Sequence, residues 1–128
     1  MYKIFIAIFI FVAAIITGVI LFSDGEKENT STASNIKIES GKQIITINAK
    51  GGYTPRVTNA KASMPTVIKI DTNGTFDCSS SVVIPKLNYR KNLPPSGETL
   101  VEVPAQQAGT SIRGLCSMGM FSFNINFN

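Results

Sequence analysis

The chain has 128 residues, the size of one domain, and it contains no histidine and only two cysteines, Cys78 and Cys116. Without an imidazole it cannot form a Ser–His or Cys–His catalytic pair or a three-histidine zinc site, so we expect no enzyme. Its net charge of +4 is mild and scattered, which argues against a nucleic-acid partner.

The N-terminal segment is strongly apolar. Residues 4–22 carry no charge, and at a rise of ~1.5 Å per residue they are long enough to cross a hydrocarbon core of ~30 Å. The following residues, SDGEKE, contain no small-residue cleavage site, which favours an uncleaved signal anchor over a removed leader. Lys3 on the short side indicates a cytoplasmic N-terminus. We therefore expect residues 1–23 to be a single transmembrane helix of the cell membrane, with the rest of the chain on the extracytoplasmic side.

A polar segment separates this helix from a domain with strand-like patterning. Residues 24–35 are small and polar and are expected to form a flexible linker. From residue 36 to 128, Gly, Pro and Asn recur between stretches rich in Ile, Val, Thr and Phe, which is typical of a small antiparallel sandwich or barrel. The strands predicted by this pattern are 43–49, 66–71, 81–84, 100–103, 110–115 and 121–127.

The last predicted strand has the clearest alternation in the chain. Phe121, Phe123, Ile125 and Phe127 lie on one face, and serine and asparagine side chains lie on the other. No long window after the N-terminal segment shows a helical period. We therefore expect an all-β domain with one buried face on this strand and little or no long helix.

Sulfur-bearing side chains gather just before this strand. Cys116, Met118 and Met120 alternate with Ser117 and Gly119, so they share one face in an extended strand or converge in a loop that turns at the glycine. Thiolate and thioether sulfurs are soft donors that select Cu(I) over hard cations. The spacing therefore indicates a candidate metal site, to which Cys78 contributes only if the fold brings it close.

Other interpretations of the same residues remain open. Two cysteines in a translocated domain commonly form one structural disulfide, and methionines near a strand end are commonly core residues. Met64, next to Pro65, is expected in surface or core packing rather than at a metal. The serines after Cys78 are expected to be ordinary hydrogen-bonding surface. A redox-active dithiol is a further possibility, although the chain lacks a Cys-x-x-Cys pair.

Longer stretches carry a resemblance to a known family. The run YTP at 53–55, GTFDCSSSVVIPKLNYRKNLPP at 74–95 and TLVEVPAQQAGTSIRGLCSMGMFSFNINF at 99–127 resemble the cupredoxin-like domain of extracytoplasmic bacterial copper-handling proteins. In that family a cysteine precedes a strand of the type found at 82–85, and a Cys-x-Met-Gly-Met element follows a later strand, as at 116–120. The resemblance implies a Greek-key β-sandwich whose copper end is built from two loops, one carrying Cys78 and the other Cys116.

The resemblance implies copper as the ligand, and the composition narrows its oxidation state. A blue-copper electron-transfer centre uses two histidines, which this chain lacks. We therefore expect Cu(I), bound by Cys78, Cys116, Met118 and Met120, with Met120 slightly preferred over Met118. The expected role is copper trafficking or resistance, with a copper transporter or another copper protein as partner. The alternatives are a disulfide-stabilised interaction module without metal, or a dithiol or copper electron-transfer protein.

Overall fold

The computed structural model describes residues 1–22 and 34–128, with side chains described for 1–16 and 34–128. The chain divides into two compact units, of which the first contains helix α1 (Tyr2–Phe22) and the second the β domain. Over the described residues, no helix meets both the length and the apolarity needed to cross a bilayer. The expected linker, 24–35, lies almost entirely outside the described residues.

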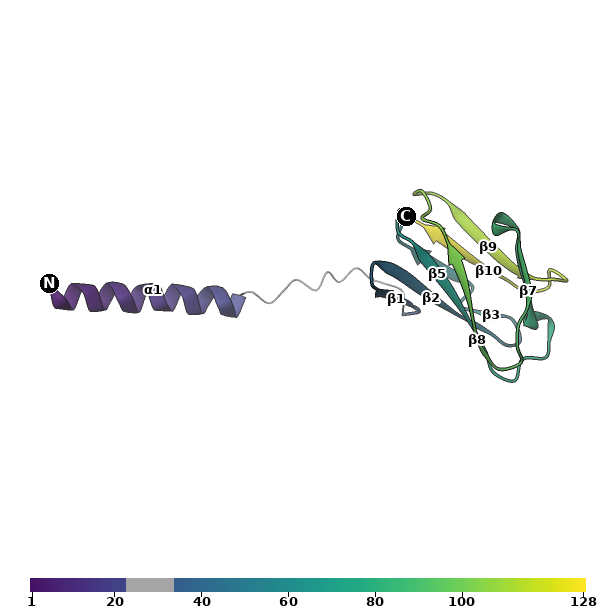
Figure 1. Ribbon diagram of the computed structural model, residues 1–128, viewed down its shortest axis with the longest axis horizontal. Coiled ribbons are helices and arrows are strands. Elements are labelled where there is room, and N and C mark those ends of the chain that lie inside the picture. The colour runs from purple at the N-terminus through teal and green to yellow at the C-terminus, as the bar shows by residue number, and fades with distance from the viewer. Residues whose placement is uncertain (23–33) are drawn as a thin grey trace. The chain divides into compact units, whose positions relative to one another are not determined.

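The β domain contains short strands and two single turns of 3-10 helix, and no α-helix is found between residues 34 and 128 (Figure 1). In chain order its elements are β1 (Ile36–Glu39), β2 (Lys42–Ala49), β3 (Tyr53–Thr54), β4 (Val57–Ala60), β5 (Thr66–Thr72), η1 (Cys78–Ser80), β6 (Ser81–Ile84), η2 (Pro85–Leu87), β7 (Tyr89–Asn92), β8 (Gly97–Val103), β9 (Ser111–Cys116) and β10 (Ser122–Phe127). The predicted all-β character of this part of the chain is confirmed.

Two five-stranded sheets form the sandwich. The first has the order β1, β2, β5, β8, with β3 added beside β2, and the second has the order β4, β10, β9, β6, β7. Most neighbours are antiparallel, as the pattern of a small antiparallel sandwich indicates, but β2 pairs with β5 and β4 pairs with β10 in parallel, so both sheets are mixed. The chain from β2 passes through β4 in the other sheet before it returns as β5, and such a crossover allows two neighbouring strands to run in the same direction.

The core lies between the sheets and is built from alternate residues of the longer strands. Its fully buried large apolar side chains are Ile45, Ile47, Ile68, Ile70, Val82, Ile84, Ile112, Phe123, Ile125 and Phe127. The alternation predicted for the last strand is confirmed at Phe123, Ile125 and Phe127, whereas Phe121 is half-buried because it lies in the loop before β10. The period of two thus determines which face of each strand is removed from water.

All of the predicted strands are present, as β2, β5, β6, β8, β9 and β10, although β8 begins at Gly97 rather than at residue 100. Sequence patterning missed β1, β3, β4 and β7. These strands are two to four residues long, and β1, β4 and β7 lie at sheet edges, where a strand needs only one partner. β7 reads Tyr-Arg-Lys-Asn, and exposed charges of this kind on an edge hinder pairing with another chain.

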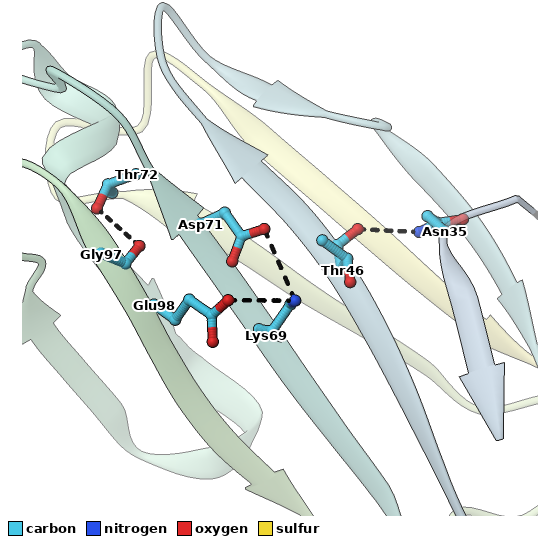
Figure 2. Close-up of polar contacts among 7 residues, drawn as sticks. All are labelled: Asn35, Thr46, Lys69, Asp71, Thr72, Gly97 and Glu98. Carbon is cyan, nitrogen blue, oxygen red and sulfur yellow. Dashed lines mark hydrogen bonds and ion pairs between the residues drawn. The ribbon is translucent and has the colours of Figure 1, made fainter. Parts of the chain in front are cut away.

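The first sheet carries an ion-paired group of side chains on its outer face (Figure 2). The Lys69 ammonium lies 3.4 Å from a Glu98 carboxylate oxygen and 3.9 Å from one of Asp71, and these residues come from the paired strands β5 and β8. On the inward side of β5, the buried Thr72 hydroxyl donates a hydrogen bond of 3.2 Å to the Gly97 carbonyl. Ion pairs at this degree of exposure contribute ~1 kcal/mol or less, so this face keeps the sheet solvated rather than holding it together.

Candidate functional site

The two cysteines meet at one end of the sandwich. Cys78 opens η1, Cys116 ends β9, and their sulfurs are joined in a disulfide with the Cα atoms 5.7 Å apart. Val82 of β6 pairs directly with Cys116, so the strand that follows η1 brings Cys78 alongside the end of β9. Of the alternatives left open by the sequence, the disulfide is therefore the one that the structure contains.

Cys116 is held by a β-hairpin. β9 and β10 are antiparallel, and Leu115 opposite Ser122 is the first pair beside the loop 117–121 that joins them. This loop turns at Gly119, whose positive φ of 73° is unfavourable for other residues. The Gly119 N–H donates to the Cys116 carbonyl at 2.8 Å, and the Phe121 N–H points at the Cys116 sulfur at 3.4 Å. The side chain of Cys116 has no exposed surface. Its sulfur is therefore fixed by the hairpin and by the core.

Cys78 is held by a shorter and more polar element. Asp77 occupies the position before η1, and the buried Ser79 hydroxyl donates to both of its carboxylate oxygens, at 2.8 and 3.0 Å. Desolvation alone would raise the pKa of the Asp77 carboxyl, but hydrogen bonds from the Ser79 hydroxyl and from the N–H groups of Asp77, Ser79 and Gly51 lower it below the ordinary 3.8. Cys78 itself is half-buried.

Ser79 corrects one expectation from the sequence. The serines after Cys78 were expected to be surface residues, but Ser79 is completely buried. A buried hydroxyl needs a partner, and the neighbouring Asp77 carboxylate provides it. Ser79 therefore orders the turn that presents Cys78 to Cys116.

The two methionines of the hairpin loop face solvent. Met118 is 82% exposed and Met120 is 68% exposed, so neither is the core residue that their position near a strand suggested as an alternative. Met120 lines a hollow of about 180 Å³, together with Gly52, Tyr53, Arg56 and others, whereas Met118 does not. The hairpin thus carries both thioethers close in sequence to Cys116, and of the two only Met120 lines this hollow.

Tyr53 belongs to this hollow and was not singled out by its sequence context. Its side chain is 3% exposed and its ring packs edge-to-face with that of Phe123, with the ring centroids 5.1 Å apart, while its hydroxyl has no hydrogen-bond partner within the described chain. Burial, with a smaller contribution from the Asp77 charge, raises the pKa of Tyr53 to about 12. Beside it, the half-buried Phe121 ring lies 3.4 Å from where a Cβ on Gly52 would stand. The Gly51-Gly52 turn that follows β2 therefore lies close to the hairpin loop, which no local pattern of the sequence predicts.

Met64 lies away from this end. The Met64 carbonyl accepts the Thr66 hydroxyl at the start of β5, and the neighbouring Ala62 N–H bonds the Asn128 carbonyl beyond the end of β10. The hairpin loop precedes the beginning of β10, at the opposite end of that strand. Met64 therefore lies at the other end of the sandwich from Cys116.

The donor set at the disulfide end is composed of sulfur. Among the residues described, no three histidine, cysteine or acidic side chains gather in the way that a hard or borderline cation requires. Two cysteine sulfurs in contact and two thioethers in the adjoining loop fit a soft monovalent ion once the disulfide is reduced, because a disulfide sulfur carries no thiolate. The chemistry of the site therefore depends on its oxidation state.

Comparison with known proteins gives the same fold. The model of the family described as cupredoxin-like domain matches residues 10–124. Among solved structures, a copper binding protein determined in its apo form by NMR is 29% identical, with a TM-score of 0.65, over 73% of this chain and 94% of that chain. The metal binding domain of the Streptococcus pneumoniae D39 Cu(I) exporting P-type ATPase CopA, solved with Cu(I), is 19% identical, with a TM-score of 0.64, over 73% and 92%. No curated protein matches the chain.

Proposed function

We propose, from the premise that the chain belongs to the cupredoxin-like domain family, that its reduced form binds Cu(I) as cargo. Cys78 and Cys116 supply two thiolates, and Met120 supplies a thioether, with Met118 as the second candidate. The role is copper trafficking or resistance, carried out by binding rather than by catalysis, and the exchange partner is a copper transporter or another copper protein.

The contact between the two cysteines is the observation that carries this proposal. They come from different segments of the chain, and the fold brings them together in the immediate neighbourhood of two solvent-facing thioethers. Sulfur donors favour Cu(I), and the absence of histidine leaves no imidazole for a blue-copper centre. The likeness to a 29% identical copper binding protein supports copper as the metal.

We further propose that the domain works outside the cytoplasm. Disulfides form and persist in oxidising compartments, and the described cysteines form one. The uncharged residues 4–22 would serve as the signal anchor that holds the domain at the membrane. Membrane fractionation of cells, followed by protease treatment of intact cells, tests this location. Recovery of the chain in the cytosolic fraction would contradict it.

Copper binding is tested by titrating the fully reduced full chain with Cu(I) against a chromophoric Cu(I) chelator. We expect stoichiometric uptake, reduced at least about a hundredfold in affinity by Cys116→Ser, because a hydroxyl is a hard donor that Cu(I) does not prefer. Ser80→Ala, in the same turn as Cys78, is the matched control and should bind like the wild type. The affinity should also fall at low pH, because the thiols must lose their protons to bind. Equal affinity in Cys116→Ser and wild type would contradict the proposal.

One observation favours a second candidate function. The disulfide itself is consistent with an interaction module in which Cys78 and Cys116 only stabilise the sandwich. The same titration separates the two, since a module of this kind takes up no Cu(I) even when its thiols are fully reduced.

A further inference from the structure

The disulfide is buried unevenly. Cys116 has no exposed surface and lies inside the core, whereas Cys78 is half-buried at the start of η1, directly after the exposed Phe76 and Asp77. Thiol–disulfide exchange proceeds by attack of a thiolate on one sulfur, and access decides which sulfur is attacked. An external thiolate therefore reaches the sulfur of Cys78 more readily than the sulfur of Cys116.

The sulfur of Cys116 is the leaving group of this reaction, and its surroundings favour its release as a thiolate. When a thiolate attacks Cys78, the S–S bond breaks and Cys116 departs with the electron pair. The Phe121 N–H already points at the Cys116 sulfur at 3.4 Å, so a hydrogen-bond donor stands where the negative charge develops. A backbone N–H held by a hairpin needs no rearrangement to stabilise this charge.

We infer that the Cys78–Cys116 disulfide is a directional redox site, which a protein dithiol reduces by attacking Cys78 and releasing Cys116 as a thiolate. In the first step a new S–S bond forms between the reductant and Cys78. In the second step the other thiolate of the reductant attacks its own bonded sulfur and frees Cys78. The dithiol loses two electrons and becomes a disulfide, and its two protons end on Cys78 and Cys116 or in solvent.

This inference concerns the regulation of the site proposed above and rests on that proposed function for its consequence. The oxidised site lacks thiolates and does not take up Cu(I), and reduction at Cys78 generates both thiolates together. Phe76, two residues before Cys78 in the chain, is 82% exposed and offers an incoming protein an apolar contact.

The experiment traps the first step on the oxidised full chain. The probe is a thioredoxin whose resolving cysteine has been replaced by serine, so that the mixed disulfide persists. After an acid quench, the released thiol is alkylated under denaturing conditions and the protein is cut with trypsin, which places Cys78 in residues 70–86 and Cys116 in 114–128. We expect the probe on 70–86 and the alkyl group on 114–128, in at least about tenfold excess over the reverse. Probe on 114–128, on both equally or on neither would overturn the inference.

A matched pair of variants tests the role of the Phe121 N–H. Phe121→Pro removes the donor, and Phe121→Ala removes the ring but keeps the donor. We expect Phe121→Pro to slow mixed-disulfide formation about fivefold relative to Phe121→Ala, in keeping with ~1 kcal/mol for one hydrogen bond. Equal rates in the two variants would remove the N–H from the mechanism, and circular dichroism of each variant shows that the sandwich is intact.

The outcomes for redox chemistry and for copper are separate. Cu(I) binding is measured on protein reduced beforehand with a phosphine, so it does not depend on which sulfur a thiol attacks. Correct trapping at Cys78 without Cu(I) uptake would contradict the proposed function alone. Cu(I) uptake with trapping at Cys116 would contradict the inference alone.

Discussion

The two cysteines and the two methionines of the candidate site lie at the same end of the molecule in opposite environments. Cys116 is completely buried and Cys78 is half-buried, whereas Met118 and Met120 are mostly exposed. Both cysteines are held by secondary structure, core packing and their disulfide, while the thioethers project from a loop. The difference separates two roles for sulfur. The cysteines are part of the frame of the domain, meaning its packed strands and the disulfide, whereas the methionine side chains are open to solvent and to an incoming ion.

Breaking the covalent link should have the largest effect on the frame. The disulfide closes a segment with a sequence separation of 38 residues, and the chain-entropy model assigns ~3 to 4 kcal/mol to a loop of this size. We expect the double variant Cys78→Ser/Cys116→Ser to lose about this much free energy of unfolding relative to the oxidised wild type. Urea denaturation measures it. A loss below ~1 kcal/mol would mean that the hydrophobic core alone fixes this end.

The frame around Cys116 should be almost as sensitive to a single methyl group. A Cβ on Gly114 would stand 2.2 Å from the ring of Phe123, which is fully buried. The ring has no room to move, so Gly114→Ala should destabilise the domain by ~2 to 3 kcal/mol. Thermal unfolding measures the change. Gly109→Ala, at a positive φ but in open space, is a control for backbone strain without the clash.

The methionines should affect ion affinity and leave the frame unchanged. Met120 borders the hollow and Met118 does not, so we expect Met120→Leu to weaken Cu(I) binding about tenfold, or ~1.4 kcal/mol, and Met118→Leu to weaken it less. Both variants should unfold within ~0.5 kcal/mol of the wild type, because both side chains face water. Equal affinity in both variants and the wild type would remove the thioethers from the site.

Tyr53 offers the smallest and most specific test, because it joins the frame to the hollow. Its hydroxyl is buried without a partner in the described chain, so Tyr53→Phe should gain about 1 kcal/mol at neutral pH. Burial raises the folded-state pKa of Tyr53 from 10.0 to about 12, so the folded state holds this proton more tightly than the unfolded state does. The free energy of unfolding of the wild type should therefore fall as the pH rises from 10 through 12. Tyr53→Phe should not show this fall in the free energy of unfolding, and urea denaturation across this pH range measures it. Tyr89→Phe is the control, since burial also raises the pKa of Tyr89 but that residue is only half-buried.

Much of the sandwich was predictable because strand patterning is local. Ile45, Ile47, Phe123, Ile125 and Phe127 are buried as their alternation predicts. The short edge strands were missed, since β3 and β7 carry too few apolar residues to show a period. The parallel pairing of β2 with β5 was also missed, because it depends on a crossover through the second sheet and not on either strand's own pattern.

The candidate site divides in the same way. The sequence alone, without histidine and with a Cys-x-Met-Gly-Met element, predicts sulfur ligands for a copper ion, because donor chemistry belongs to the residue type. Only the tertiary structure decided that Cys78 reaches Cys116, that Ser79 is buried beneath its turn, and that the Phe121 N–H meets a sulfur. The physical reason is that these contacts arise when two sheets pack around one core. The local pattern of a strand does not predict which loops then lie at the same end of the sandwich.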